Sequence, residues 1–345
     1  MSPDGCSPAL RARARAGTLR KGTTMQTRLT ELLGIEHPVM LAGMGGVSYH
    51  RLAAAVSAAG GIGTLGAATM DAATMDAEMS ALRALTDRPW GVDLLTAMPG
   101  DMAAQVQRII DGGARIFVGA LGVPREVIAL CHDADVLVVN MCGRVHHAVQ
   151  AVEAGCDLVV AQGTEAGGHT GRVATLPLVP QIVDAVGDRV PVVAAGGIVD
   201  GRGVAAALAL GADGVWIGTR FIATPEARVS LGYHDALLGA DESQTTVSRS
   251  YSGKPMRVIA NERTSYFDRH PDELVPFPEQ MLESIREGVL HLPTGPDDPD
   301  VDPSRECYPS GQGVGAIDAV LPAGDLVRQL VADAEAALRR VDGLR

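Results

Sequence analysis

The sequence alternates between short apolar runs and stretches rich in alanine and leucine from residue 38 to about residue 221. The apolar runs are PVMLAGM (from Pro38), GIGTLGA (from Gly61), WGVDLLT (from Trp90), ARIFVGAL (from Ala114), DVLVVNM (from Asp135), CDLVVAQG (from Cys156), VPVVAAGG (from Val190) and GVWIGTRF (from Gly214). Each run is nearly continuous in apolar residues, which is typical of parallel strands that are covered on both faces. Eight such runs separated by helical stretches predict an α/β fold, the (β/α)8 TIM barrel.

A doubly wound sheet is the alternative fold, and it would need a GxGxxG fingerprint at the start of its first helix. The segment GMGGVS, from Gly43 to Ser48, does not supply this fingerprint, so the barrel is favoured. In such barrels, the loops that follow the strands form the active face. The longest gap between successive runs follows the sixth run. We therefore expect the chemistry to lie in the sixth loop.

Changes in composition divide the chain into four parts. Residues 1–24 are rich in Arg, Ser and Gly and are expected to form a disordered tail, and residues 25–239 are expected to form the barrel. Residues 240–312 are polar and rich in proline, which predicts an inserted cap or lid after strand eight. Residues 313–345 carry an apolar stripe that includes Leu326, which predicts a C-terminal helix packed back on the barrel.

The net charge of −12 is unevenly distributed. The first 24 residues carry five cations and one acid, so the rest of the chain is more acidic than the whole. An acidic chain disfavours nucleic acid or an anionic membrane as the main partner. No apolar run approaches the ~18 residues of a membrane span. The five cysteines are odd in number and lack CxxC spacing, which favours a reduced cytoplasm over a disulfide framework or a metal site.

The stretch QGTEAGGHTG, from Gln162 to Gly171, directly follows the sixth apolar run. Its glycines let backbone amides approach a ligand closely because they have no Cβ. His169 is the one side chain in this stretch that can move a proton near neutral pH. An ordinary Gly-rich turn is the alternative interpretation of the stretch taken alone. Within a barrel, the same stretch predicts an active-site loop.

A second group of glycines follows the seventh and eighth runs. Gly196 and Gly197 end the seventh run, and Gly218 precedes the hydroxyl of Thr219 after the eighth. Phosphate groups in barrels commonly bind at these two loops, near the N-terminus of a short helix. We therefore predict a bound phosphate group at this end of the barrel. Arg220 would either add countercharge there or form a surface ion pair.

Several of these motifs together resemble the nitronate monooxygenase family, and the sixth-loop motif resembles its class I branch. The motifs are AGMGG, GGIGTLG, QGTEAGGHTG, AAGGI and GTRF, and the resemblance covers about residues 26–345. It implies a TIM-barrel enzyme that holds FMN without a covalent bond. It also implies the oxidation of alkyl nitronates, such as propionate 3-nitronate, by dioxygen to a carbonyl compound and nitrite. The oligomeric state is left open, and a homo-oligomer is compatible with the sequence.

The resemblance also implies roles for individual residues. It makes His169 the catalytic base and assigns no metal ligand. The cofactor-binding positions that it implies are Gly43, Met44, Asp93, Gln162, Gly167, Gly168, Gly196, Gly197, Gly218, Thr219 and Gln312. Many relatives have asparagine where this chain has Asp93, and a carboxylate can accept a hydrogen bond from the flavin N3–H but cannot donate as an amide does. The alternative role for Asp93 is that of an acid at a strand end that caps a helix.

Four other polar residues near the expected site keep two interpretations each. Glu165 is expected to fix backbone N–H groups, with catalysis as the alternative. Arg172 would clamp a nitronate oxygen or pair with an acid at the rim. His146 and His147 begin the helix after the fifth run. Exposure to solvent is expected for both histidines, and a substrate role is left open.

Two other functions fit parts of the same pattern. An NAD(P)H:quinone reductase or an FMN-dependent enoyl reductase would use the same scaffold, and both resemble this family. A non-redox barrel that binds a phosphate group is the third interpretation. An enzyme like IMP dehydrogenase is disfavoured because it needs a nucleophilic cysteine after strand six, and no cysteine lies between Gln162 and Thr175.

Overall fold

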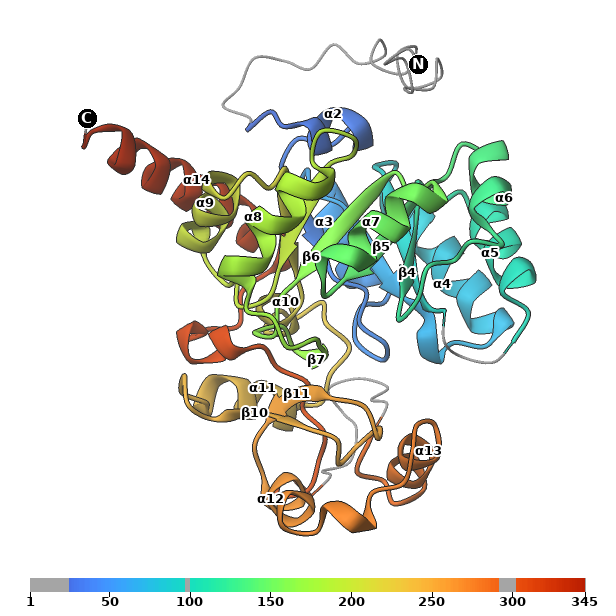
Figure 1. Ribbon diagram of the computed structural model, residues 1–345, viewed down its shortest axis with the longest axis vertical. Coiled ribbons are helices and arrows are strands. Elements are labelled where there is room, and N and C mark those ends of the chain that lie inside the picture. Colours follow the sequence, from blue (N-terminus) through green and yellow to red (C-terminus); the bar gives the residue numbers. More distant parts are fainter. Residues whose placement is uncertain (1–24, 97–99, 292–301, 345) are drawn as a thin grey trace.

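The computed structural model describes residues 25–96, 100–291 and 302–344. Eight parallel strands form one sheet in the order β1-β9-β8-β6-β5-β4-β3-β2, and a bridge between Met40 and Ile62 joins β1 to β2 (Figure 1). The strands are Val39–Leu41 (β1), Gly63–Gly66 (β2), Trp90–Leu95 (β3), Ile116–Ala120 (β4), Leu137–Cys142 (β5), Leu158–Gln162 (β6), Val192–Ala195 (β8) and Gly214–Ile217 (β9). This nearly closed (β/α)8 barrel confirms the predicted fold class.

Helices surround the barrel and connect its successive strands (Figure 1). They are His50–Ala58 (α3), the 3-10 helix Ala67–Thr69 (η2), Ala72–Leu85 (α4), Met102–Asp111 (α5), Ile128–Asp133 (α6), Val145–Ala154 (α7), Thr175–Val186 (α8), Gly201–Ala209 (α9) and Thr219–Ile222 (α10). Parallel strands can be joined only by such crossovers, because each new strand must start at the same end of the sheet. The carboxyl ends of all eight strands therefore meet at one rim.

Both faces of the barrel sheet are buried. In β5, Leu137 and Val139 belong to a cluster inside the barrel, whereas Val138 belongs to the cluster under the outer helices. This alternation follows from the pleat of a strand, in which successive side chains point to opposite faces. It explains why the strand sequences read as continuous apolar runs.

Helix α2 (Arg28–Leu33) closes the amino end of the barrel. Its residues Leu29 and Leu33 join the apolar cluster inside the barrel. The N-cap residue Thr27 accepts a hydrogen bond from the first turn of the helix and donates one to the backbone oxygen of Asp213 at 2.6 Å. Figure 1 shows α2 at the end of the barrel opposite to β10 and β11. The amino end is thus filled by side chains, and the carboxyl end is left for a site.

The chain after β9 builds a second unit on the carboxyl side of the barrel (Figure 1). Its elements are Leu231–Gly239 (α11), Thr245–Ser248 (β10), Met256–Ile259 (β11), Glu262–Arg269 (α12), Pro271–Glu273 (η3), Glu279–Arg286 (α13) and Gln312–Ala316 (η4). Strand β11 pairs with β10 and also with β7 (Gly168–His169) of the sixth loop. Within this second unit, we call residues 240–291 and 302–312 the post-barrel segment; α11 and most of η4 lie outside it. Its role as a lid stays a prediction.

Helix α14 (Ala323–Asp342) packs against α9 and α3 on the outside of the barrel. Leu326 and Leu330 are buried in the outer cluster, and Leu338 packs partly against it. Figure 1 shows the last turns of α14 extending beyond the body of the molecule, where Val341 is 56% exposed. The predicted disordered tail, residues 1–24, lies outside the described residues.

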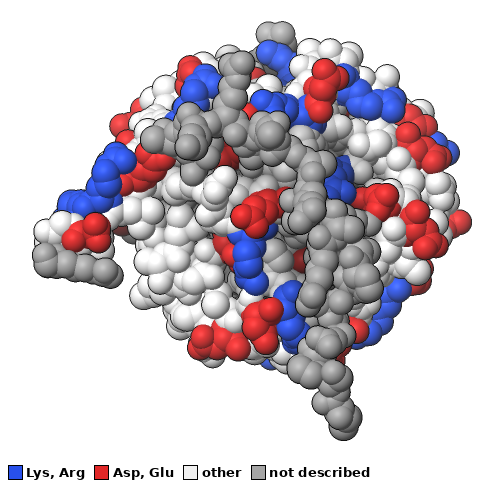
Figure 2. Space-filling view, turned by 90° about the horizontal axis from the view of Figure 1, so that it is seen from above, with Lys and Arg blue, Asp and Glu red and all other residues white. Residues whose placement is uncertain are grey.

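Figure 2 views the surface from the α2 side. Lys and Arg side chains are interspersed with Asp and Glu side chains around the periphery of this face. Opposite charges that lie close together offset one another's field within about a Debye length, ~8 Å at physiological ionic strength. In the described part of the chain, no helix is both long enough and apolar enough to span a bilayer.

Gly63 in β2 lies where helix α3 packs directly on the strand, and this close contact requires a residue without a Cβ. A Cβ at Gly63 would overlap the backbone of Ala53 in α3. Gly63→Ala is therefore expected to lower the free energy of unfolding by about 1–3 kcal/mol, as other overpacked cores do. Gly239→Ala is the matched control, because nothing lies within 4 Å of the added methyl there. Urea unfolding monitored by circular dichroism measures both, and equal stabilities of the two variants would contradict this account.

Candidate active site

A cavity of about 990 Å³ lies at the carboxyl end of the barrel. Every barrel strand or the loop after it contributes lining residues, and the post-barrel segment supplies the opposite wall. Ligand sites in proteins generally measure about 300–1,000 Å³. This cavity is therefore large enough for a mononucleotide cofactor together with a substrate.

The structure brings nearly all of the predicted site residues to this cavity. The lining includes Gly43, Met44, Asp93, Gln162, Gly167, Gly168, His169, Gly196, Gly197, Gly218 and Thr219. Gln312 differs, because it lines a smaller neighbouring cavity of about 350 Å³ together with Gly196 and Gly197. The backbone N–H of Gln312 donates to the oxygen of Glu165 at 2.8 Å. Gln312 thus holds the sixth loop from outside the main cavity.

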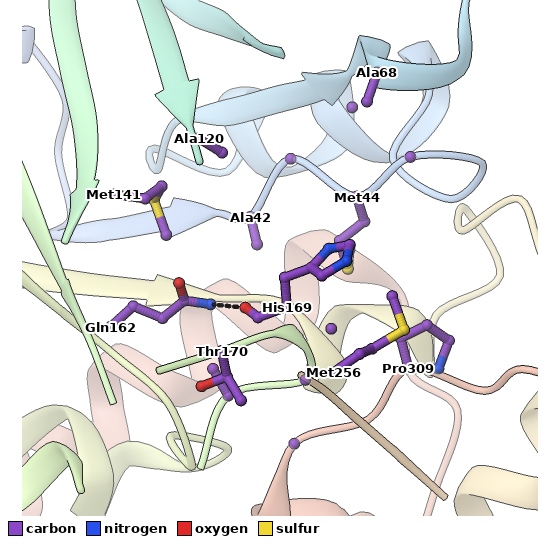
Figure 3. Close-up of a pocket in the computed structure, with 18 of the residues that line it drawn as sticks. Ala42, Met44, Ala68, Ala120, Met141, Gln162, His169, Thr170, Met256 and Pro309 are labelled. Atoms are coloured by element: carbon purple, nitrogen blue, oxygen red, sulfur yellow. Dashed lines mark hydrogen bonds between the residues drawn. The ribbon is translucent and has the colours of Figure 1, made fainter. Parts of the chain in front are cut away.

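Backbone contacts on both sides hold His169 at the rim. Strand β7 pairs with β11, so that His169 lies opposite Met256. From the other side, the side-chain amide Nε2 of Gln162, at the end of β6, donates to the backbone oxygen of His169 at 3.2 Å (Figure 3). Figure 3 also shows the imidazole extending from β7 toward Met44, which follows the first strand. Strand pairing therefore directs this side chain into the cavity.

The imidazole of His169 is neutral at pH 7. Burial, together with the nearby positive charge of Lys254, lowers the pKa of His169 to about 4. The ring Nε2 lies 2.9 Å from the hydroxyl oxygen of Ser252, which is itself 1% exposed. A neutral imidazole has one N–H and one nitrogen lone pair. One ring nitrogen is thus engaged by Ser252. When Nε2 donates to this hydroxyl oxygen, the lone pair of Nδ1 is left to accept a proton.

Three glycines of the site have backbone conformations that other residues resist. The φ angles are 72° at Gly168, 110° at Gly196 and 72° at Gly197. Only glycine adopts this left-handed region without a steric penalty from Cβ. At Gly196, an added Cβ would also lie 3.0 Å from the backbone oxygen of Gly163. The sixth and seventh loops can pack this closely because both are built from glycine.

The loop after β9 is tied to the end of the post-barrel segment. Thr219 Oγ1 accepts a hydrogen bond from the backbone N–H of Gly311 at 2.8 Å, which leaves the hydroxyl hydrogen of Thr219 to donate elsewhere. Arg220 has neither of its two predicted roles. Its guanidinium is buried and donates to the backbone oxygen of Ala319 at 3.2 Å. Among the described residues, Arg220 does not line the cavity and forms no ion pair; it ties the end of the barrel to the chain near Ala319.

Of the four remaining polar residues near the predicted site, only His147 lines the main cavity, and Glu165, Arg172 and His146 do not. The Glu165 carboxylate accepts from the backbone N–H and the hydroxyl of Thr175, both at 2.7 Å, so it fixes the start of α8. Arg172 is exposed and does not line the cavity. His147 lines the cavity, whereas His146 does not, and their ring centroids are 4.2 Å apart. His147 is therefore placed to meet a ligand.

Asp93 lies inside β3 and not at a strand end, so the helix-capping alternative is wrong. Its side chain packs directly over Gly43, where any Cβ would overlap it. Asp93 Oδ1 is buried and has no hydrogen-bond partner among the described residues. Burial raises the pKa of Asp93 well above its usual range. An unpaired buried polar atom costs about 1–3 kcal/mol, which a ligand donor would offset.

Sequence reasoning missed several polar residues of the cavity. Asn140 is buried within β5, and its side-chain amide donates to the backbone oxygens of Gly119 at 3.0 Å and Gly122 at 2.5 Å. A polar residue inside an apolar run is a signal that could have identified Asn140. Lys254 and Glu306 also line the cavity. Nothing in the local pattern of the post-barrel segment identified these two.

Comparisons with known proteins agree with this geometry. A family model described as nitronate monooxygenase matches residues 26–105 and 96–333. The chain is also similar to the (3aS,4S,5R,7aS)-5-hydroxy-7a-methyl-1-oxo-octahydro-1H-indene-4-carboxyl-CoA dehydrogenase of Rhodococcus jostii. The two are 43% identical over 237 residues, which cover 69% of this chain and 66% of that relative's length.

Two solved structures are similar over almost the whole chain. The structure of FabK from Thermotoga maritima has a TM-score of 0.85 and 33% identity, and the match covers 93% of this chain and all of that one. A nitroalkane oxidase from Streptomyces ansochromogenes has a TM-score of 0.77 and 31% identity. That match covers 91% of this chain and 99% of the oxidase.

The buried carboxyl of Asp93 predicts a pH-dependent stability of the ligand-free protein. Its raised pKa means that the folded state keeps a proton which the unfolded chain releases above about pH 4. Its contribution to stability is therefore full at low pH and is lost as the pH rises. The Asp93→Asn variant has no carboxyl group to titrate at this position. Its free energy of unfolding relative to that of the wild type should therefore increase as the pH rises from 4 to 7. Urea unfolding measures the difference.

Asp133→Asn, at an exposed position, is the control for this experiment. Its stability difference from the wild type should stay constant over the same pH range. If the Asp93→Asn difference is equally constant, the buried carboxyl is ionised in the folded state and the account is wrong.

Proposed function

This chain belongs to the nitronate monooxygenase family of oxidoreductases, and we propose that it is an FMN-dependent enzyme that oxidises alkyl nitronates with dioxygen to a carbonyl compound and nitrite. The observation that carries this proposal is one cavity that combines the neutral imidazole of His169 with the glycines that follow barrel strands β8 and β9. The similarity to a nitroalkane oxidase supports the substrate class.

The residues of the cavity fit a flavin nucleotide in two respects. Gly196, Gly197 and Gly218 present close-packed backbone that we assign to the phosphate group, at the loops where barrels commonly bind one. Asp93 packs directly over Gly43 at the wall of the cavity, and we assign the unpaired Oδ1 of Asp93 to the flavin N3–H. FMN supplies the redox chemistry when bound, by taking electrons from the substrate and passing them to dioxygen.

His169 is the proposed base. A general base works best when its pKa lies near the working pH, and a pKa of about 4 makes His169 a weak one. This favours the nitronate anion as substrate, because the anion has already lost the carbon-bound proton. A bound anion near the ring would also raise the pKa of His169 by charge attraction. In this proposal, His169 removes a proton from a neutral nitroalkane and stabilises the nitronate by hydrogen bonding.

We propose small-molecule partners and a cytoplasmic location. The partners are the nitronate and dioxygen, without nucleic acid or membrane. The cysteines at positions 131, 142, 156 and 307 are all free and buried, which is compatible with a reducing compartment.

A second candidate is a flavin-dependent reductase or dehydrogenase that exchanges electrons with NAD(P)H. The specific observation in its favour is the 43% identity to the CoA-ester dehydrogenase, which is higher than the 31% to the nitroalkane oxidase. The volume of the cavity would also admit a substrate larger than a small nitronate. The two candidates differ in what reduces the flavin.

The cofactor and the electron donor together separate these functions. The purified protein is expected to be yellow and to release FMN on denaturation. Under air, ethyl nitronate should yield nitrite with superoxide dismutase present, and anaerobic NADH or NADPH should reduce the flavin poorly. Rapid reduction by a nicotinamide without nitrite release would select the second candidate. A colourless protein that cannot bind added FMN would exclude both.

The role of His169 is tested by two forms of one substrate. His169→Asn should lower turnover of neutral nitroethane by about 10²–10⁴-fold, the usual contribution of a general base. Turnover of preformed ethyl nitronate should fall far less, because no proton is removed from carbon. His270→Asn, at an exposed position in the post-barrel segment, is the control and should leave both rates unchanged. Equal rates for both substrates in the wild type and the His169 variant would contradict the assignment.

A further inference from the structure

The cavity extends beyond the residues assigned to the cofactor, into the post-barrel segment. Its wall there is apolar and is formed by Met281, Leu282 and Ile285 of α13 and by Leu290 just after that helix. Leu282 is 50% exposed and Ile285 is 43% exposed. Leaving such side chains in water loses the favourable free energy of burying their apolar surface. A hydrocarbon ligand in this part of the cavity would cover them.

One acidic side chain interrupts this apolar wall. Glu306 lines the cavity and is only 3% exposed. Its Oε1 accepts a hydrogen bond from the backbone N–H of His291 at 3.1 Å. Its Oε2 is buried and has no hydrogen-bond partner among the described residues. A buried carboxyl oxygen without a donor is unfavourable. A ligand group that donates a hydrogen bond to Oε2 would therefore supply what the described residues do not.

We propose that the space between α13 and Glu306 binds the hydrocarbon body of an extended substrate, and that Glu306 Oε2 accepts a hydrogen bond from a hydroxyl group on that body. The inference rests on the proposed function, because it names the substrate class of the same site. The substrate is then a nitronate with a long apolar chain or ring that carries a hydroxyl group, rather than a short nitroalkane.

The chemistry of the carboxylate selects a hydroxyl over other groups. An ionised carboxylate only accepts hydrogen bonds, so a ketone or a methyl group would leave Oε2 unpaired. Burial raises the pKa of Glu306 to about 7, and the group is therefore mostly ionised at pH 8. An ammonium group could also donate, but its burial against Leu282 and Leu290 would cost far more than burial of a hydroxyl group.

Binding to the FMN-loaded enzyme tests the inference without turnover. Straight-chain carboxylates are the probes, since a carboxylate resembles a nitronate in shape and charge and does not react. Flavin absorbance at pH 8 reports binding. Affinity should rise with chain length by about fourfold for each methylene that becomes buried. A long probe that ends in a hydroxyl group should bind at least about tenfold tighter than its methyl or ketone analogue.

Two variants separate the contributions of the carboxylate and the apolar wall. Glu306→Gln keeps an oxygen for the N–H of His291 and turns an NH₂ toward the substrate, so it should prefer the ketone probe over the hydroxyl probe. Leu282→Asn should weaken the dependence on chain length. Leu85→Asn, an exposed leucine on α4 away from the cavity, is the matched control and should behave as the wild type.

Each outcome decides the inference. Equal affinity of the wild type for hydroxyl and methyl probes overturns the role of Glu306, and affinity that is independent of chain length overturns the subsite. Thermal melting and FMN content show whether each variant folds, and the wild-type probe series is decisive even if Glu306→Gln does not. If ethyl nitronate yields no nitrite while the probes bind as expected, the proposed function fails and the subsite stands.

Discussion

The arrangement of the site depends on one short stretch of strand pairing, that of β7 with β11. Two residues of the sixth barrel loop, Gly168 and His169, pair with Arg257 and Met256. The guanidinium of Arg257 is buried and adds a hydrogen bond of 2.8 Å to the backbone oxygen of Thr164, at the start of the same loop. A Gly-rich loop alone would have many conformations to lose on ordering. The pairing fixes one of them and carries the imidazole into the cavity.

Close packing around glycine is the second constraint, and it follows from composition. The chain has 41 glycines and only 3% aromatic residues. Without bulky side chains to fill space, elements must approach one another closely, and positions such as Gly43 and Gly63 allow this. The same property that lets α3 pack on β2 also lets the Asp93 side chain pack directly over Gly43 at the wall of the cavity.

Two carboxyl groups in the cavity are buried with an oxygen that no described residue contacts by a hydrogen bond: Asp93 on the barrel side and Glu306 on the opposite wall. Folded proteins tolerate few such atoms, because each costs free energy that folding does not recover. Keeping two such atoms in one cavity lowers the stability of the ligand-free fold. The barrel and the post-barrel segment each contribute one of them to the cavity wall.

The sequence by itself determined the barrel and most of the residues at its rim. Parallel strands buried on both faces leave continuous apolar runs, and the residues that follow them meet at one edge, so His169 and Gly197 could be brought together without coordinates. Only the tertiary structure decided that Ser252 contacts His169, that Gln312 lies outside the main cavity and that Glu306 lies inside it. These contacts join segments far apart in the chain, and a single hydrogen bond or an unpaired oxygen leaves no periodic trace in the sequence. The folding of the post-barrel segment over the barrel brings them together.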